Sequence, residues 1–218
     1  MVVLLDKSEI WFPDPCLAEP DGLLAIGGQL TVPWLLAAYS RGIFPWSADP
    51  ITWWSPDPRA IIELDKFHVP RSLRRVLKKG MFTVTFDMAF EQVIRMCAEP
   101  YPGREETWIT EPIIKAYVEL YKSGYAHSVE CWNEGKLVGG VYGVAIGGFF
   151  AGESMFHTMS NASKVALYFL VERLRERHFE LFDIQMVTSV TKLLGAIEIP
   201  RTEYLDRLKR ALEKSCEF

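Results

Sequence analysis

Three polar side chains interrupt apolar segments in the second half of the sequence. Glu153 follows the glycine-rich apolar run "GGFFAG", and Asp183 and Gln185 alternate with apolar residues in "LFDIQM". Leaving an unpaired charge in apolar surroundings costs several kcal/mol, so these carboxylates must be paired, solvated in a cleft or engaged with a ligand. A carboxylate that is hydrogen-bonded to an amide can polarise that amide against an incoming amine. The three residues indicate a site for orientation and modest base catalysis.

Asp183 and Gln185 are two positions apart on a predicted strand, so both side chains should leave the same face of a sheet. Alternation alone would favour a solvated face. Glu153 lies on another predicted strand, and convergence of the three polar groups at one sheet edge favours a site. The glycines around it allow close backbone packing or leave room for a ligand.

Other catalytic arrangements are not supported by the residue spacing. Ser154 in "GESM" is not a G-x-S-x-G nucleophile elbow, and no histidine has a serine and an acid at a recognisable spacing. No C-x-x-C spacing occurs, so neither a metal site nor a disulfide framework is indicated. The four cysteines are Cys16, Cys97, Cys131 and Cys216.

A basic segment, "PRSLRRVLKKG", is bounded by Pro70 and Gly80, as expected of a helix. Its cations recur at helical spacing on one face, and no acidic residue occurs between Lys66 and Phe86. A solvated helix face is the common explanation of such a run, but solvated helices generally mix charge signs. In a chain of net charge −4, the stripe is a candidate phosphate-binding track. It comprises Arg71, Arg74, Arg75, Lys78 and Lys79.

The elements that must position these residues form two regions. Residues 1–62, rich in Pro, Gly and Trp, predict a small irregular domain with one helix over 31–42. Residues 63–218 predict a larger domain of mixed α/β class on a single sheet. Its expected strands are 81–86, 126–134, 136–148, 149–156 and 180–187, and its expected helices are 70–80, 87–100, 111–124 and 160–179, with another at the end of 191–212. A hydrophobic content of 49% fits a globular chain, and the lack of a leader or bilayer-length apolar run predicts a cytoplasmic location.

Taken together, the motifs resemble those of the leucyl/phenylalanyl-tRNA–protein transferase family, in order and spacing, from Trp11 to Tyr204. The motifs are "DGLLAIGGQL", "AAYSRGIFPW", "WWSPDPR", "SLRRVL", "TWI", "AHSVE", "LVGGVYGVAIG", "GESMF", "NASKVAL", "FDIQ" and "LGAIEIPR". The resemblance implies a bacterial aminoacyltransferase that moves Leu or Phe, and less readily Met, from aminoacyl-tRNA to the N-terminal Arg or Lys of acceptor proteins. This transfer marks the acceptors for N-degron degradation.

The resemblance also implies that a small N-terminal domain precedes an acyltransferase domain with a GNAT-type fold. It further implies that the protein is a monomer and uses no cofactor or metal. GNAT enzymes that use acyl-CoA hold its pyrophosphate in a glycine-rich turn before the long helix. The corresponding turn, "HTMSNASK", has no glycine. This difference favours a tRNA ester as the acyl donor.

By resemblance, Asp183 orients Gln185, which takes or relays the proton of the attacking amine, and Glu153 helps to hold the cationic acceptor residue. Aromatic residues of the family that engage the 3′-terminal adenosine of the tRNA match Trp46 and Trp108. The pocket for the donor side chain matches Val141, Phe150, Leu170 and Phe182.

The chain departs from the family pattern after "FDIQ". The family has Cys, His and Ser where this chain has Ile184, Val190 and Leu193, which puts contacts of the last two positions in doubt. Two other interpretations stay open: a related aminoacyl-tRNA or acyl-CoA transferase on the same fold, and a tRNA-binding module with a decayed site. The intact Glu153, Asp183 and Gln185 weigh against the second.

Overall fold

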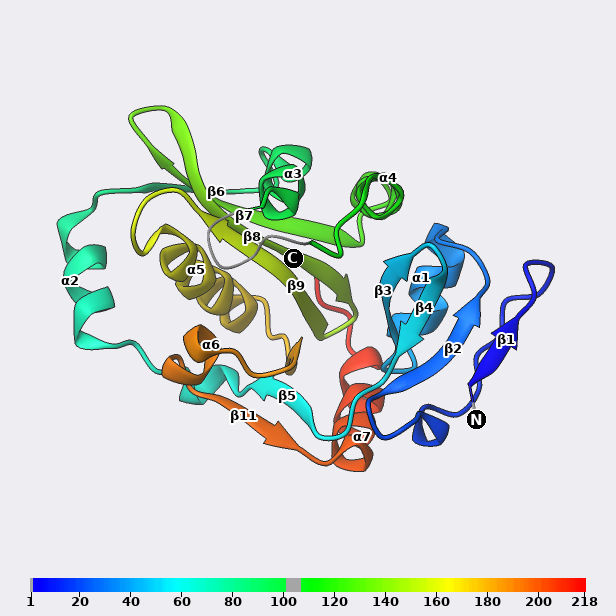
Figure 1. The fold of residues 1–218 in the computed structure, drawn as a ribbon. Helices are drawn as coiled ribbons and strands as arrows, with labels where there is room; N and C mark the ends of the chain where they lie inside the picture. The colour runs from blue at the N-terminus through cyan, green and yellow to red at the C-terminus, as the bar shows by residue number, and fades with distance from the viewer. Residues whose placement is uncertain (1, 101–106) are drawn as a thin grey trace.

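The computed structural model describes residues 2–100 and 107–218, which form two sheets with helices packed around them (Figure 1). The first sheet has the strand order β1-β2-β4-β3. Its strands are β1 (Val3–Leu5), β2 (Leu23–Gly27), β3 (Phe44–Ala48) and β4 (Ile51–Trp54), accompanied by α1 (Val32–Tyr39) and a short 3-10 turn, η1 (Pro15–Leu17). The prediction of an irregular N-terminal region was wrong, because four short strands of this region pair into a sheet.

The second sheet contains the remaining described strands in the order β11-β5-β10-β9-β8-β7-β6. Neighbours β9 and β10 are parallel and the other pairs are antiparallel. The mixed α/β class and the single sheet of the larger region are thus confirmed. The strands are β5 (Arg59–Ile62), β6 (Thr83–Phe86), β7 (Ala126–Asn133), β8 (Lys136–Ile146), β9 (Phe149–His157), β10 (Leu181–Gln185) and β11 (Ala196–Ile199).

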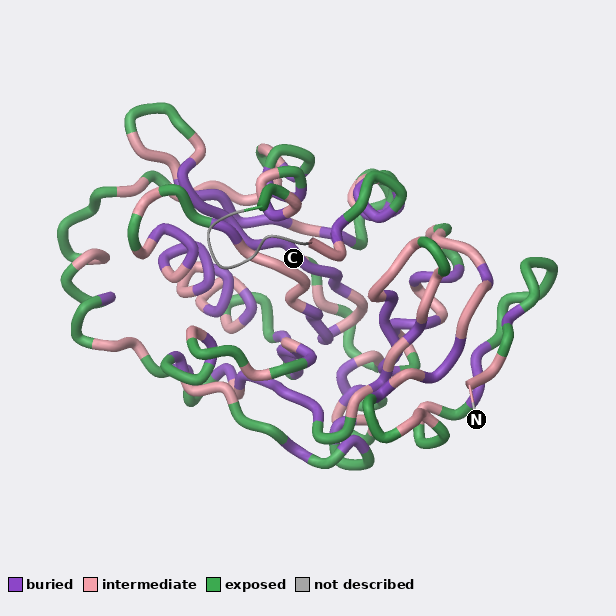
Figure 2. The backbone as a smooth tube through the Cα atoms, viewed as in Figure 1, coloured by how far each residue is buried: buried purple, intermediate pink, exposed green. Residues whose placement is uncertain are grey.

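Helices cover both faces of the second sheet. One face packs on α5 (Ala162–Glu176), the crossover helix that a parallel β9–β10 pair requires, and the other packs on α3 (Phe90–Ala98) and α4 (Glu111–Lys122). Figure 2 shows the buried backbone running through the strands and the inner sides of these helices. The remaining elements are α2 (Arg71–Lys79), α6 (Ser189–Leu193), α7 (Arg201–Leu212) and the 3-10 turn η2 (Leu64–Lys66).

The two sheets share an apolar core. Trp34 of α1, Tyr117 of α4 and Tyr204 of α7 belong to one buried cluster. The domain boundary expected after residue 62 falls at the end of β5, a strand that already pairs with β10 and β11 in the second sheet. The division into residues 1–62 and 63–218 stays a prediction, and in the structure both parts reach the candidate site.

Candidate active site

Three β-bulges lie at the residues that the sequence singled out. The register of β3 shifts at Trp46, that of β9 shifts at Glu153, and that of β10 shifts at Ile184, next to Gln185. A bulge inserts an unpaired residue and re-aims the side chains beside it. The bulges turn Trp46, Glu153 and Gln185 toward one hollow between the two sheets.

The expected alternation from Asp183 to Gln185 was wrong, because the bulge at Ile184 interrupts it. Gln185 also has a positive φ of 57°, which a non-glycine residue adopts only when its surroundings hold it. The surroundings include the carboxylate of Asp183, whose Oδ1 accepts the backbone N–H of Gln185 at 2.9 Å. Asp183 therefore orients Gln185 through its backbone.

Asp183 is fully buried and paired with Arg59. The guanidinium donates from Nε to Oδ1 at 2.9 Å and from Nη2 to Oδ2 at 2.7 Å, and the Tyr204 hydroxyl donates to Oδ2 at 3.0 Å. Arg59 is 1% exposed, and its guanidinium lies between the rings of Phe44 and Tyr204. Burial alone would lower the pKa of Arg59, but the Asp183 carboxylate raises it above the usual value. All the oxygen positions of Asp183 are thus occupied by protein donors.

Arg59 extends this network to the N-terminal region. Its Nη1 donates to the carbonyl of Gly42 at 3.0 Å, an oxygen that also accepts the hydroxyl of Ser55. The sequence analysis missed Arg59, although it lies in the motif "WWSPDPR". The residues next to Arg59 do not indicate an ion-pair partner 124 positions away. The one available signal was an arginine at the start of the strand-like apolar stretch "RAII", which could have suggested a buried cation.

Glu153 lies half-buried at the wall of the hollow, with a tyrosine hydroxyl on each oxygen. Tyr39 donates to Oε1 at 2.8 Å and Tyr117 donates to Oε2 at 3.2 Å, while the two hydroxyls also contact each other. Burial is the main cause that raises the pKa of Glu153 to about 8; the Tyr39 hydroxyl acts against it. The carboxyl is therefore poised to change charge just above neutral pH.

The side-chain amide of Gln185 can be placed in two orientations. With its nitrogen toward Glu153 it donates to Oε1 at 3.3 Å; turned over, the nitrogen donates to the carbonyls of Gly152 at 2.9 Å and Ile184 at 3.0 Å. The turned orientation replaces one long hydrogen bond by two shorter ones. It leaves the amide oxygen of Gln185 beside the carboxyl of Glu153, so that two acceptors face the same space once Glu153 has ionised.

Two adjoining hollows meet at these acceptors. One, of about 230 Å³, is walled by Trp46, Trp108, Ile184, Glu153 and Gln185 together with Phe44, Pro45, Met186 and Thr188. The other, of about 400 Å³, shares Glu153 and Gln185 and continues between β8, β9, β10, α5 and α6, where its apolar lining includes Val141, Met155, Leu167 and Phe182. An aromatic compartment and an apolar compartment therefore open on either side of the polar pair.

Two of the four residues expected around the donor side chain do not line the apolar hollow. Phe150 and Leu170 are fully buried behind it, and Phe150 supports the ring of Phe182 at 5.8 Å between centroids. Of the departures from the family pattern, Ile184 and Val190 line this hollow, whereas Leu193 is 59% exposed on α6. A valine at 190 adds to the apolar character of the compartment.

The basic stripe lies on α2, at the far end of the molecule from the first sheet (Figure 1). All five of its cations are exposed, while Leu73 on the opposite face is buried. Gly80 ends the helix in the left-handed conformation, with φ of 60°. Among the described residues, no carboxylate forms an ion pair with the stripe. The expected one-sided helix is confirmed.

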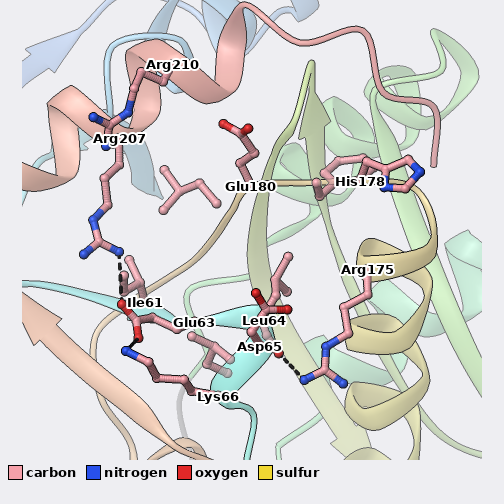
Figure 3. A pocket seen from close by; sticks show the side chains of 13 residues that line it. Ile61, Glu63, Leu64, Asp65, Lys66, Arg175, His178, Glu180, Arg207 and Arg210 are labelled. Atoms are coloured by element: carbon pink, nitrogen blue, oxygen red, sulfur yellow. Dashed lines mark hydrogen bonds and ion pairs between the residues drawn. The ribbon is translucent and has the colours of Figure 1, made fainter.

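A larger hollow, of about 670 Å³, lies between β5, η2, the end of α5 and α7 (Figure 3). Within its lining Glu63 pairs with Lys66 and Arg207, and Arg175 donates to the carbonyl of Leu64. None of the three predicted catalytic residues lines it. Cavity size therefore does not identify the site, whereas convergent polar groups do.

Residues 2–100 and 107–218 contain no cluster of His, Cys, Asp and Glu that could hold a metal ion. None of their helices combines the length and the apolar character that crossing a bilayer demands.

Comparison with known proteins agrees with the geometry. Residues 61–209 match the family model of leucyl/phenylalanyl-tRNA protein transferase, and residues 28–57 match the model of its N-terminal domain. A leucyl/phenylalanyl-tRNA–protein transferase of Anaeromyxobacter dehalogenans is 53% identical over 93% of this chain and 88% of its own. One from Maridesulfovibrio salexigens is 52% identical over 98% and 90%, respectively.

Solved structures with a similar arrangement are distant in sequence. An L-PGS from Bacillus licheniformis has a TM-score of 0.45 at 14% identity and covers 77% of this chain and 54% of that one. A GCN5-related N-acetyltransferase from Kribbella flavida has a TM-score of 0.44 at 12% identity, covering 80% and 63%. Likenesses this distant carry no argument about activity. Identity near 50% over almost the whole chain shows that the protein belongs to the leucyl/phenylalanyl-tRNA–protein transferase family of aminoacyltransferases.

Proposed function

We propose that the protein transfers Leu or Phe, and less readily Met, from aminoacyl-tRNA to the N-terminal Arg or Lys of acceptor proteins, and so marks them for N-degron degradation. The observation that carries this proposal is the pair of acceptors formed by the Gln185 amide oxygen and the Glu153 carboxyl. When Glu153 is ionised, an incoming amine has N–H groups to donate to both. Its lone pair is then directed away from them, toward an ester carbonyl.

The chemistry needs little beyond this orientation. An aminoacyl ester is already activated, and an α-amino group with a pKa of about 7.7–8.0 is partly unprotonated at neutral pH. The new amide C–N bond forms as the ester C–O bond breaks, and the proton lost by the amine ends on the ribose oxygen that leaves. Positioning supplies most of the acceleration. A primary amide is a weak base, so Gln185 orients the amine and relays its proton, with Asp183 fixing the Gln185 backbone.

The two hollows suit the two parts of the donor. The apolar hollow is lined by Val141 and Phe182 and would take the Leu or Phe side chain, with Phe150 and Leu170 packed behind the lining. A pocket of this type discriminates between apolar side chains only modestly, by about 1–3 kcal/mol per methylene. The indoles of Trp46 and Trp108 would engage the terminal adenosine, since base–aromatic stacking contributes about 1–3 kcal/mol.

The α2 stripe would bind the tRNA backbone, and its removal tests this role. Replacing Arg71, Arg74 and Arg75 with Ala is expected to weaken Phe-tRNA binding and to reduce the slope of log Kd against log salt by about two to three, because each phosphate contact releases about 0.9 counterion. Binding measured by filter retention over a salt series checks this. A matched variant with Lys115, Lys136 and Lys209 replaced, three exposed cations outside α2, should keep the wild-type slope. An unchanged slope in the α2 variant would show that the stripe is a solvated helix face that does not contact the tRNA phosphates.

Acceptor choice would rest on Glu153, whose carboxyl reaches both hollows and can pair with a cationic acceptor residue. We further infer that the protein acts as a monomer in the cytoplasm, where aminoacyl-tRNA is available, and needs no cofactor. The expectation that no cofactor is needed is supported by the chemistry, because the aminoacyl ester supplies the free energy of the new amide bond.

The deciding experiment is transfer of radiolabelled Phe from Phe-tRNA to peptides that differ only at the N-terminus, Arg against Ala. We expect label on the Arg peptide alone, and no modification of either peptide when CoA thioesters replace the tRNA. Tight Phe-tRNA binding without transfer to any peptide would instead favour a tRNA-binding module, and transfer from a CoA thioester would favour the related acyl-CoA transferase.

A further inference from the structure

We infer that Tyr39 and Tyr117 are positioning residues that hold the Glu153 carboxyl toward the acceptor amine. The inference rests on the proposed function, in which Glu153 faces the acceptor. It assigns part of that site to α1 in the N-terminal region.

The contacts are direct and come from distant parts of the chain. Tyr39 on α1 donates to one oxygen of Glu153 and Tyr117 on α4 donates to the other, across 114 and 36 positions in sequence. With one hydroxyl on each oxygen, the carboxyl cannot rotate without breaking both hydrogen bonds. Its remaining acceptor positions face the hollow that Gln185 also lines.

The two tyrosines remain hydrogen-bond donors throughout the working pH range, because burial raises the pKa of each well above its usual value. The other charged and titratable groups around Glu153 are Arg59 on β5, Asp183 on β10 and Tyr204 on α7. These three residues hydrogen-bond to one another and not to Glu153. The hydroxyls of Tyr39 and Tyr117 therefore set the orientation of the Glu153 carboxyl.

Buried tyrosines are often ordinary core residues, and both rings do pack in the apolar cluster. A core role requires the ring but not the hydroxyl, whereas positioning of Glu153 requires the hydroxyl. Phenylalanine at either position separates the two roles. Tyr121 offers a matched control, since it lies one turn after Tyr117 on α4 and donates to the backbone carbonyl of Asp87 at 2.8 Å, away from Glu153.

The test is the steady-state transfer of Phe to an N-terminal Arg peptide by Tyr39→Phe, Tyr117→Phe and Tyr121→Phe, with KM measured for each substrate. Above about pH 8, where Glu153 is ionised, the first two variants are expected to raise KM for the peptide about tenfold or more, the effect of losing one hydrogen bond to a charged group. Their KM for Phe-tRNA should stay unchanged. The pH at which peptide binding improves should move upward, because a lost donor favours the protonated carboxyl. Tyr121→Phe should behave as wild type in all three measurements.

Combination with Glu153→Gln decides whether the tyrosines act through this carboxyl. In the Glu153→Gln background, Tyr39→Phe and Tyr117→Phe should add little further loss in peptide KM, since the group that they position is gone. Full additivity, or equal effects on both substrates with no change in pH profile, would overturn the inference while leaving the transferase activity established. Absence of transfer by the wild-type protein would instead count against the proposed function.

Discussion

Replacing Arg59 with methionine is expected to lower the free energy of unfolding by about 3–5 kcal/mol, because it leaves the Asp183 carboxylate buried without its cation. Transfer of Phe to an Arg peptide should fall by about 100-fold or more, since a shift of about 1 Å in an orienting group can cost that much. Urea unfolding and initial rates check the two parts. Arg95→Met is the matched control: Arg95 bridges Glu91 and Glu111 on the surface, and exposed pairs of this kind contribute about 1 kcal/mol or less.

The double variant Arg59→Met with Asp183→Leu separates folding from chemistry. Removing both partners of a buried ion pair can be nearly neutral for stability, so part of the lost unfolding free energy should return; the remainder stays lost because the Gln185 N–H and the Tyr204 hydroxyl lose their acceptor. Activity should not return, because the Gln185 backbone loses its Asp183 acceptor and the positive φ loses its support. Recovery of transfer together with stability would show that Asp183 serves only the fold.

The ion pair also shows why sequence reasoning reached Asp183 and missed its partner. Asp183 lies in an alternating apolar strand, where a carboxylate is conspicuous. Arg59 follows "SPDP", a stretch typical of a turn, where an arginine is ordinarily solvated. The side chain becomes buried because β5 enters the second sheet between β10 and β11. This long-range pairing has no local signature.

Elements with clear end signals were predicted well. Pro70 and Gly80 bounded α2, and apolar spacing located α3, α4 and α5 within a few residues. The N-terminal sheet was not predicted, since its strands are three to five residues long and one of them, β3, contains Pro45. The sequence analysis did not single out Tyr39 and Tyr117, because the periodicity of a helix reports which face is buried and not which partner a hydroxyl group reaches.

The bulges explain the remaining difference at the site. Sequence periodicity assumes that side chains alternate strictly along a strand, and the residues that matter lie where alternation fails, at Trp46, Glu153 and Ile184. The types of the polar residues therefore predicted a site, whereas the directions in which their side chains point could be seen only in the structure.

Above about pH 8, where Glu153 is ionised in the wild type, Glu153→Gln is expected to raise KM for an N-terminal Arg peptide about tenfold or more, because a neutral amide cannot pair with the acceptor cation. KM for Phe-tRNA should be little changed. In the wild type, peptide KM should fall as pH rises through about 8, where Glu153 ionises. The acceptor α-amine also titrates near 8, so the ratio of the variant to the wild-type KM isolates the carboxyl. A ratio that is independent of pH would contradict a role for the Glu153 charge.

The same substitution should also change the pH dependence of stability. The pKa of Glu153 is near 8 in the folded protein and near 4.5 in the unfolded chain, so the folded state holds the proton more tightly. Stability from this group is full below pH 4.5 and declines as pH rises toward 8, where ionising the carboxyl in the folded protein becomes as easy as leaving it protonated. Glutamine carries no such term, so the unfolding free energy of Glu153→Gln relative to wild type should rise by several kcal/mol between about pH 5 and pH 8. A parallel pH dependence in the two proteins would place the Glu153 carboxyl in water-like surroundings and would remove the basis for its ionisation near the pH of catalysis.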